Sequence, residues 1–203
     1  MTTPRNHSFG QNQSLTVMDR LGRWLSNRRI AREVGQSNGR EAADIGCGFD
    51  AKISTTTLDG WTSVLLFDLA LDPALDSRPG WQRIEGPLPD TLSAAPDASL
   101  DVIICNNVLE HLIEDRKAVE EIHRILRPGG IALINVPSWT GKFVLETAAF
   151  RLNLAPADEM DDHKRYYSTN ELWTLLVAGG FLPSNLKVSR AKLGTNTFAR
   201  AIR

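Results

Sequence analysis

The sequence has few cysteines and no long apolar run. Its two cysteines, Cys47 and Cys105, give no disulfide framework, and neither lies in a Cys-x-x-Cys or Cys/His spacing that could hold a metal. No run of about 18 apolar residues could cross a bilayer, and the start, MTTPRNHSFGQNQS, lacks the apolar segment of a secretion signal. We therefore expect a protein of the reducing cytoplasm with no metal centre.

The sequence also lacks an excess of charge of either sign. A formal net charge of -1 argues against a general nucleic-acid binder, because phosphate binding depends on clustered Lys and Arg. The charge is nevertheless uneven. Residues 1–40 hold seven Arg and two acids, and residues 186–203 hold five basic residues and no acid. An anionic acceptor or partner is compatible with these basic ends.

The composition fits one globular domain, since 203 residues with 42% hydrophobic content can bury a proper core. Residues 1–14 are polar and lack periodic apolar positions, so we expect a flexible lead-in. Over residues 15–36, apolar residues recur at about helical spacing with arginines between them, which predicts one or two basic amphipathic helices. Such a helix either packs on the domain or serves as a lid or membrane-surface contact.

Four short apolar runs predict strands: EAADIG, SVLLFD, LDVIICN and GIALINVP. Between the last two, IEDRKAVEEIHRILRPGG predicts a helix with one apolar face and a glycine stop. Strand, helix and strand in this order predict a right-handed crossover and a parallel sheet. A helix that begins near Ser168 and an antiparallel pair of strands, NLKVSRAKL and TFARAIR, complete an α/β domain over residues 15–203.

The stretch REAADIGCGFD places Asp44, Gly46 and Gly48 where a buried strand ends. Glycines at this point let the backbone approach a ligand without a Cβ in the way. Two glycines alone are a weak signal, because a tight turn would explain them equally well. Asp68 supports the ligand interpretation: it closes the next apolar run, 20 residues after Gly48, where an acid can accept both hydroxyls of a ribose.

Two more observations narrow the ligand. Asn106 and Asn107 follow the strand LDVIIC, at the edge where open α/β sheets bind ligands. Asp44 precedes the glycines, where a carboxylate attracts an amine and repels a pyrophosphate. The loop also lacks the G-x-G-x-x-G pattern, which argues against a nicotinamide dehydrogenase, an alternative with a similar sheet and ribose acid.

At these residues the sequence resembles the class I S-adenosylmethionine-dependent methyltransferases, and in particular their small-molecule branch. ADIGCG is similar to the family's first motif, LLFDLA to its ribose-binding segment, and PDASLDVIICNNVLEHLIEDRKAVEEIHRILRPGGIALINVP to its fourth-strand, helix and fifth-strand block. The resemblance implies a Rossmann-like, doubly wound, mostly parallel seven-stranded sheet with an antiparallel C-terminal strand, accompanied here by N-terminal helices. It also implies S-adenosylmethionine as cofactor.

The resemblance further implies which residues contact the cofactor. The amino-acid end would lie at the first glycine loop, the ribose at Asp68, and the methionine part near Asn106. Asp50 departs from the family by occupying its third glycine position, and IEGPLPD lacks the acid often found beside the adenine, so we expect nearby backbone or Asp90 to contact that ring. The expected cofactor-binding residues are Asp44, Gly46, Cys47, Gly48, Asp68, Leu69, Gly86, Pro87, Leu88, Asn106 and Asn107.

Transfer of an activated methyl group mainly requires alignment and exclusion of water. A hydroxyl acceptor must also lose a proton, usually to a positioned His or carboxylate. The candidates are His111, in NNVLEHL, and His163, in DEMDDHKRYYSTNEL, a stretch that resembles the family's H-x-R-x-Y/F segment. Each has a structural alternative: His111 as a cap or packing residue, and the segment around His163 as a solvated loop.

Residues 138–162 are an expected substrate-side insertion, since loops after strand carboxyl ends commonly set the substrate. Trp24, Trp139, Phe143 and Phe150 are candidates to line an acceptor pocket, or else ordinary packing residues.

The expected function is methyl transfer to a small-molecule or glycan acceptor, with a hydroxyl favoured and anionic or lipid-linked acceptors included. The alternatives are a non-catalytic cofactor-binding protein of the same fold and an NAD-dependent oxidoreductase. A nucleic-acid base methyltransferase is disfavoured, because CNNV lacks the Asn/Asp-Pro-Pro-aromatic pattern. A homodimer is compatible with the sequence.

Overall fold

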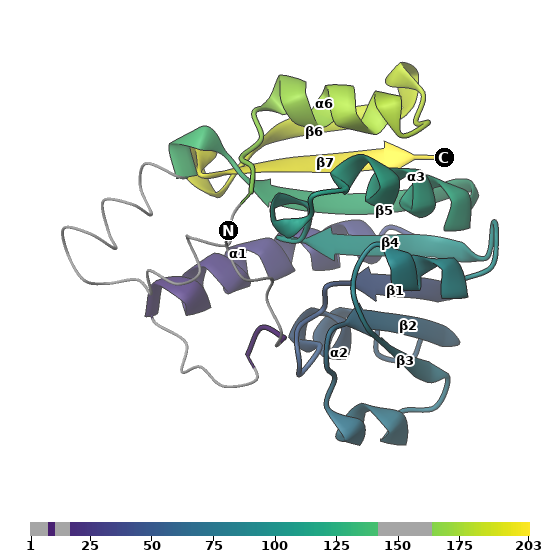
Figure 1. Ribbon diagram of the computed structural model, residues 1–203. Helices are drawn as coiled ribbons and strands as arrows, with labels where there is room; N and C mark the ends of the chain where they lie inside the picture. Colours follow the sequence, from purple (N-terminus) through teal and green to yellow (C-terminus); the bar gives the residue numbers. More distant parts are fainter. Residues whose placement is uncertain (1–7, 11–16, 142–163) are drawn as a thin grey trace.

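The computed structural model describes residues 8–10, 17–141 and 164–203 (Figure 1). These residues form a seven-stranded sheet with the order β3-β2-β1-β4-β5-β7-β6. Strands β1 to β5 pair in parallel, and β7 runs antiparallel to both of its neighbours, β5 and β6. The predicted Rossmann-like, mostly parallel sheet with an antiparallel last strand is confirmed.

The four predicted apolar runs lie in strands β1, β2, β4 and β5, and the predicted terminal pair lies in β6 and β7. The structure adds β3, which the sequence pattern does not distinguish because WQRIE is mostly polar. This strand is at the edge of the sheet, where one side faces solvent. The strands are β1 Glu41–Ile45, β2 Ser63–Asp68, β3 Trp81–Glu85, β4 Leu100–Asn106, β5 Leu126–Pro137, β6 Leu186–Ala191 and β7 Asn196–Ile202.

Helices cover both faces of the sheet, as Figure 1 shows. They are α1 Val17–Val34, α2 Lys52–Thr57, α3 Asp115–Ile125 and α6 Thr169–Ala178. Successive residues of a strand point to opposite faces, so Ala42 belongs to the same buried cluster as Ile30 of α1. Ala43 belongs to a second cluster, which includes Val119 of α3 and Leu172 of α6. Two apolar layers therefore form, one on each face of the sheet.

The predicted basic segment at residues 15–36 forms one helix, α1, and its second half packs on the sheet. Ile30 is fully buried there. The guanidinium of Arg29 lies over the Phe198 ring at 3.8 Å, and its Nη2 donates to Ser189 Oγ at 2.9 Å. Glu33 pairs with Arg200 at 3.4 Å. These contacts fix α1 to β6 and β7, while a lid function of the helix stays a prediction.

The last helix, α6, begins where the sequence predicts. It starts after Ser168, whose hydroxyl accepts from Glu171 N while the Glu171 carboxylate accepts from Ser168 N at 2.7 Å. This reciprocal pair satisfies two backbone donors that a helix start leaves open. Within the described ranges, no helix has the length and apolar content needed to cross a membrane.

Candidate functional site

The loop after β1 needs glycine for two reasons. Gly46 has a φ of +66°, and a Cβ there would lie 2.3 Å from Cγ2 of Val108. Gly48 has a φ of +76°, which also favours a residue without a side chain. The amides of Gly46 and Cys47 both donate to Phe67 O, at 2.7 and 3.3 Å. The loop is thus folded tightly onto the end of β2.

The entry into α2 differs from a regular helix start. Ala51 has φ 42° and ψ 45°, a left-handed conformation that non-glycine residues adopt rarely, and it makes no side-chain cap. This strained residue directly follows Asp50 in the chain. Because α2 spans only Lys52–Thr57, a ligand at this loop would depend on loop backbone rather than on a helix dipole. Burial raises the pKa of the Cys47 thiol, so this loop cysteine is a poor nucleophile.

Asp68 joins the first two strands at their carboxyl ends. Its Oδ2 accepts from Gly48 N at 2.7 Å, and its Oδ1 accepts from Leu69 N at 2.8 Å. The hydroxyl of Ser8 also donates to Oδ1 of this carboxylate. The carboxylate therefore faces the glycine loop and binds a hydroxyl group.

Residues 8–10 lie across this loop. Ser8 Oγ accepts from Ala70 N at 2.7 Å, and Phe9 O accepts from Phe49 N at 2.9 Å. Phe9 O is also 3.1 Å from the position that a Cβ on Gly48 would take. The sequence contains no signal for these contacts, because they use one hydroxyl and one backbone carbonyl of a polar segment. For the rest of residues 1–14, the flexible lead-in stays a prediction.

Asp44 lies behind the loop and is 1% exposed. It accepts a hydrogen bond from Ser54 Oγ at 2.6 Å. Burial raises the pKa of Asp44 to about 7; the Ser54 hydrogen bond opposes this shift, and the negative charge of Asp68 adds to it. A cation close to Asp44 would favour the ionised form of its carboxyl group. The predicted role of Asp44 beside the cofactor ammonium is compatible with this and stays a prediction.

The expected adenine-side residues form the turn after β3. Gly86 has a φ of +143°, and its amide donates to Asp68 O at 2.9 Å, which places this turn beside the ribose acid. Pro87 O accepts from Thr91 N at 3.2 Å, and Leu88 packs against the core. The carboxylate of Asp90 instead pairs with Lys117 of α3 at 2.6 Å. Backbone at the turn is therefore better placed for the ring than Asp90.

Four asparagines meet at the carboxyl ends of β4 and β5 and the start of β7. Asn135 Nδ2 donates to Asn106 Oδ1 at 2.9 Å and to Asn107 Oδ1 at 3.1 Å. Asn196 Nδ2 donates to Asn107 Oδ1 at 3.3 Å. The sequence predicts Asn106 and Asn107 at this edge but gives no sign of their partners, which come from strands 28 to 89 residues away along the chain.

His111 closes a short 3₁₀ helix over Leu109–His111, directly after β4, and is half-buried. His163 lies outside the described residues. The two residues that follow it, Lys164 and Arg165, donate their backbone amides to Glu110 O at 2.7 and 3.3 Å. The chain after His163 thus runs beside the neighbour of His111.

Two charged residues that the sequence analysis did not select lie near this edge. Glu110 is fully buried, and in the described structure neither carboxylate oxygen has a hydrogen-bond partner. Burial raises the pKa of Glu110 to about 8, with Lys192 opposing the shift. Burial likewise lowers the pKa of Lys192 to about 8, with Glu110 opposing it. The sequence offers one sign of Glu110, a carboxylate between apolar residues in VLEHL. It offers no sign that Lys192 lies near this edge.

The candidate aromatic residues of an acceptor pocket are only partly described. Trp139 is 52% exposed, donates Nε1 to Glu171 Oε2 at 3.0 Å, and contacts the Tyr166 ring. Trp24 is 53% exposed on α1. Phe143 and Phe150 lie outside the described residues, as does most of the expected insertion at 138–162. A shared aromatic pocket stays a prediction.

Comparison with known proteins agrees with this geometry. Residues 43–134 match a family model described as a methyltransferase domain. The chain is also 30% identical over 171 residues to a probable S-adenosylmethionine-dependent methyltransferase of Mycolicibacterium smegmatis, covering 78% of this chain and 59% of that protein. The chain belongs to the class I S-adenosylmethionine-dependent methyltransferases. Membership of this family argues against the nicotinamide alternative, because the cofactor of the family is a sulfonium compound.

Other methyltransferases share the sequence or the fold. A ubiquinone biosynthesis O-methyltransferase of Paraburkholderia phymatum is 30% identical over 103 residues, covering 48% of this chain and 43% of that protein. The structure of an Archaeoglobus fulgidus S-adenosylmethionine-dependent methyltransferase matches with a TM-score of 0.62 and 15% identity, covering 89% and 94% of the two chains. A Burkholderia thailandensis 1,6-didemethyltoxoflavin N1-methyltransferase matches with a TM-score of 0.62 and 17% identity, covering 88% and 76%. At these identities, the two structures show only that this chain has the same fold.

This methyltransferase chain spans 59% of the length of its M. smegmatis relative and 28% of two Mycobacterium tuberculosis relatives.

We predict that Glu110→Gln makes the stability of this methyltransferase less sensitive to pH. Between pH 4.5, the ordinary pKa, and about 8, unfolded Glu110 loses its proton while the folded protein retains it. The free energy of unfolding of the wild type therefore falls as pH rises through this window, by up to about 1.4 kcal/mol per pH unit from this group. Urea unfolding at pH 5, 6, 7 and 8 should give a flatter profile for the variant.

The control is Glu120→Gln on α3, which neutralises a carboxylate that is 48% exposed. This control should keep the wild-type slope. Parallel profiles for wild type and Glu110→Gln would show that Glu110 is ionised in the folded protein.

Proposed function

We propose that this protein transfers a methyl group from S-adenosylmethionine to a hydroxyl of a small-molecule or glycan acceptor by direct in-line transfer. The observation that carries the proposal is the hydrogen bond between the Gly48 amide and the Asp68 carboxylate. One carboxylate accepts from the glycine loop at 2.7 Å and from a hydroxyl, so it already has the chemistry that a ribose requires. Family membership supports the cofactor, and the acceptor is the part that needs testing.

The described residues fit the cofactor. The loop has two residues without side chains, Gly46 and Gly48, and Asp68 beside it has carboxylate oxygens that can accept hydrogen bonds from hydroxyls. Asp44 would lie toward the cationic amino group, and the turn at Gly86 to Leu88 would lie toward the adenine. When bound, the cofactor supplies a methyl group on a sulfonium, which is already activated for attack. The protein then mainly aligns the acceptor and excludes water.

The acceptor side of the proposal rests on the edge formed by β4 and β5. Asn106, Asn107 and Asn135 gather polar groups there, next to the loop that would hold the cofactor. The P. phymatum relative is named as an O-methyltransferase, which supports a hydroxyl acceptor. The alternative of a cofactor-binding protein without acceptor chemistry predicts binding without turnover, so an acceptor screen separates the two.

We expect Asp68→Asn to weaken binding of S-adenosylmethionine by about tenfold or more, because the amide keeps one acceptor and loses the charge-assisted pair. Calorimetric titration of the purified protein measures this affinity. The matched control is Asp59→Ala, an acid whose side chain is 81% exposed in an ion pair with Arg78. Saturable binding in the wild type and the control, weakened in Asp68→Asn, supports the proposal. No binding to the wild type would refute it.

We expect Ser8→Ala to bind S-adenosylmethionine several-fold more tightly than the wild type. The Ser8 hydroxyl donates to the oxygen of Asp68 that a ribose hydroxyl would approach, so the two donors compete for one acceptor. The same titration measures the effect, and Ser99→Ala, which removes a hydroxyl hydrogen-bonded to Pro96 O at 2.7 Å, is the control. Weaker binding in Ser8→Ala would mean that Ser8 supports the site instead of covering it.

We propose His111 as the base that takes the acceptor's proton, because it ends the 3₁₀ helix that follows β4, four residues after Asn107. Once an acceptor is found, His111→Asn should lower kcat by about 100-fold while the affinity for S-adenosylmethionine changes little. The acidic limb of the pH–rate profile should disappear in the variant. An unchanged profile with reduced kcat would assign His111 a structural role.

A further inference from the structure

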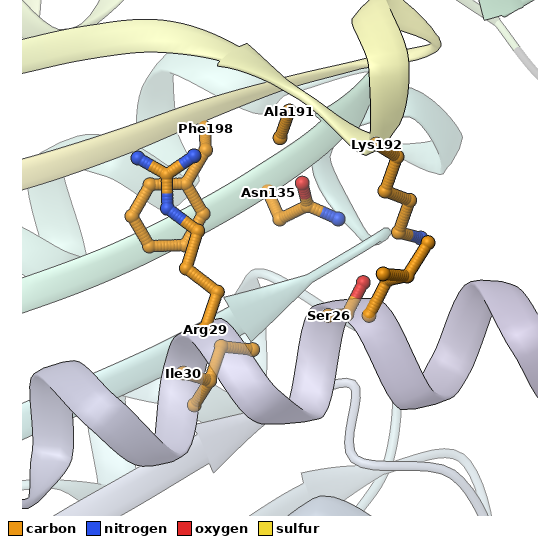
Figure 2. Close-up of a pocket in the computed structure, with 8 residues that line it drawn as sticks. Ser26, Arg29, Ile30, Asn135, Ala191, Lys192 and Phe198 are labelled. Carbon is orange, nitrogen blue, oxygen red and sulfur yellow. The ribbon is translucent and has the colours of Figure 1, made fainter.

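A small cavity lies between α1 and the ends of β5, β6 and β7. Its volume is about 100 Å³, roughly the share of three water molecules in the liquid. Figure 2 shows residues of α1 on one side of it and Asn135, Lys192 and Phe198 on the other. It is lined by Leu25, Ser26, Arg29, Ile30, Asn135, Ala191, Lys192 and Phe198.

Two polar groups in this cavity lack partners among the described residues. Ser26 is 6% exposed, and its Oγ has no hydrogen-bond partner in the described structure. The ammonium of Lys192 likewise makes no hydrogen bond or ion pair with the described residues. A buried polar atom without a partner costs stability, so its retention on the wall of a cavity points to a bound group outside the described residues.

The turn that carries Lys192 is strained. Lys192 has a φ of 48° and the next residue, Leu193, a φ of 56°, both left-handed without being glycine. Strained backbone of this kind clusters at ligand sites. Leu193 is fully exposed, so core packing does not hold the turn in this conformation. The consequence of the turn is that the Lys192 side chain is directed toward α1 (Figure 2).

The charges around the cavity favour an anion. Arg29 keeps its guanidinium over Phe198, and Lys192 adds a second cation. The acid that interacts with Lys192 is Glu110, whose burial favours its neutral form. Lys192 and Ser26 together offer donors to two oxygen atoms, and the volume admits one compact group rather than a whole acceptor.

We propose that this cavity binds a carboxylate of the methyl acceptor, held by Lys192 and Ser26. The inference rests on the proposed function, because it names the substrate class of that same site. Asn135 lines the cavity and also donates to Asn106 and Asn107, so the carboxylate subsite adjoins the edge where the methyl group would be transferred. An acceptor anchored here carries its hydroxyl away from its carboxylate, toward that edge.

This subsite would select against neutral acceptors. A neutral analogue would leave the Lys192 ammonium unpaired in a half-buried cavity, and sites built for a hydrogen-bonded group reject analogues that lack it. Lys192 is therefore a substrate-binding residue in this proposal and takes no part in the proton transfer.

The test uses benzoate and benzamide as probes, which share a ring and differ in charge. Binding is followed by NMR titration of the ¹⁵N-labelled full chain at pH 7. Benzoate should shift the amide signals of Ser26 and residues 191–194 and should bind about tenfold more tightly than benzamide. Lys192→Met keeps the unbranched stem and removes the charge, so it should weaken benzoate binding about tenfold and leave benzamide binding unchanged. Lys187→Met, on exposed β6 surface, is the control.

Equal binding of benzoate to wild type and Lys192→Met, or equal binding of the two probes to the wild type, would overturn the proposal. Signals that shift elsewhere in the chain would overturn it too. Thermal unfolding checks that Lys192→Met folds, and Lys192→Arg, which keeps the charge, should retain benzoate binding if the fold is intact. Calorimetry with S-adenosylmethionine is run on the same samples. Failure of that binding counts against the proposed function, whereas failure of benzoate binding alone counts against the subsite.

Discussion

The hydrogen bond from Gly48 N to the Asp68 carboxylate, 2.7 Å long, connects the loop after β1 to the end of β2. Strand pairing brings these residues together, since Ile45 is in register with Phe67 and the residues that follow must emerge side by side. Bonds from a backbone amide to a carboxylate are about twice as strong as neutral ones. The glycine loop is therefore held against β2 on one side, and against Val108 after β4 on the other. The loop can stay this close to its neighbours because Gly46 and Gly48 have no side chains to accommodate.

Two buried carboxyl groups and a partly buried lysine lie at this same edge of the sheet. Asp44, Glu110 and Lys192 all have a pKa shifted by burial toward the neutral form, which indicates that each costs stability where it lies. Such groups cluster at functional sites because chemistry requires them there. The core itself is made of alternating apolar residues of β1, β4 and β5, which have no such requirement. The apolar residues that stabilise the fold lie inside the sheet layers, and the ionisable groups whose burial costs stability lie at the carboxyl ends of the strands.

The sequence predicts well what depends on local patterns. The continuous apolar runs of the central strands, the one-sided helix α3 and the Ser168 cap are each visible in a single segment, and the structure contains them. What the sequence does not predict depends on tertiary contact. The edge strand β3 has no apolar run, Ser8 contacts Asp68 across 60 residues, and Lys192 owes its position to a strained turn. In the candidate site, motif and spacing predict the positions of Asp68 and Asn106 but do not predict their hydrogen-bond partners, Ser8 and Asn135.

The strand order explains why the proposed cofactor and acceptor sites would lie at different positions along the same edge of the sheet, the carboxyl ends of the parallel strands. The chain builds β1, β2 and β3 outward in one direction and then returns to place β4 on the other side of β1. At that reversal of strand order the loops after β1 and β4 are neighbours, and α/β sheets bind ligands at such a point. Gly46 and Val108 meet there. Asp68 lies on the β2 side of it, and the asparagines and the Lys192 cavity lie on the β5 and β7 side. An acceptor held by its carboxylate on that side would approach the cofactor from the β5 and β7 side, because the strand order places the two groups of residues on either side of β1 and β4.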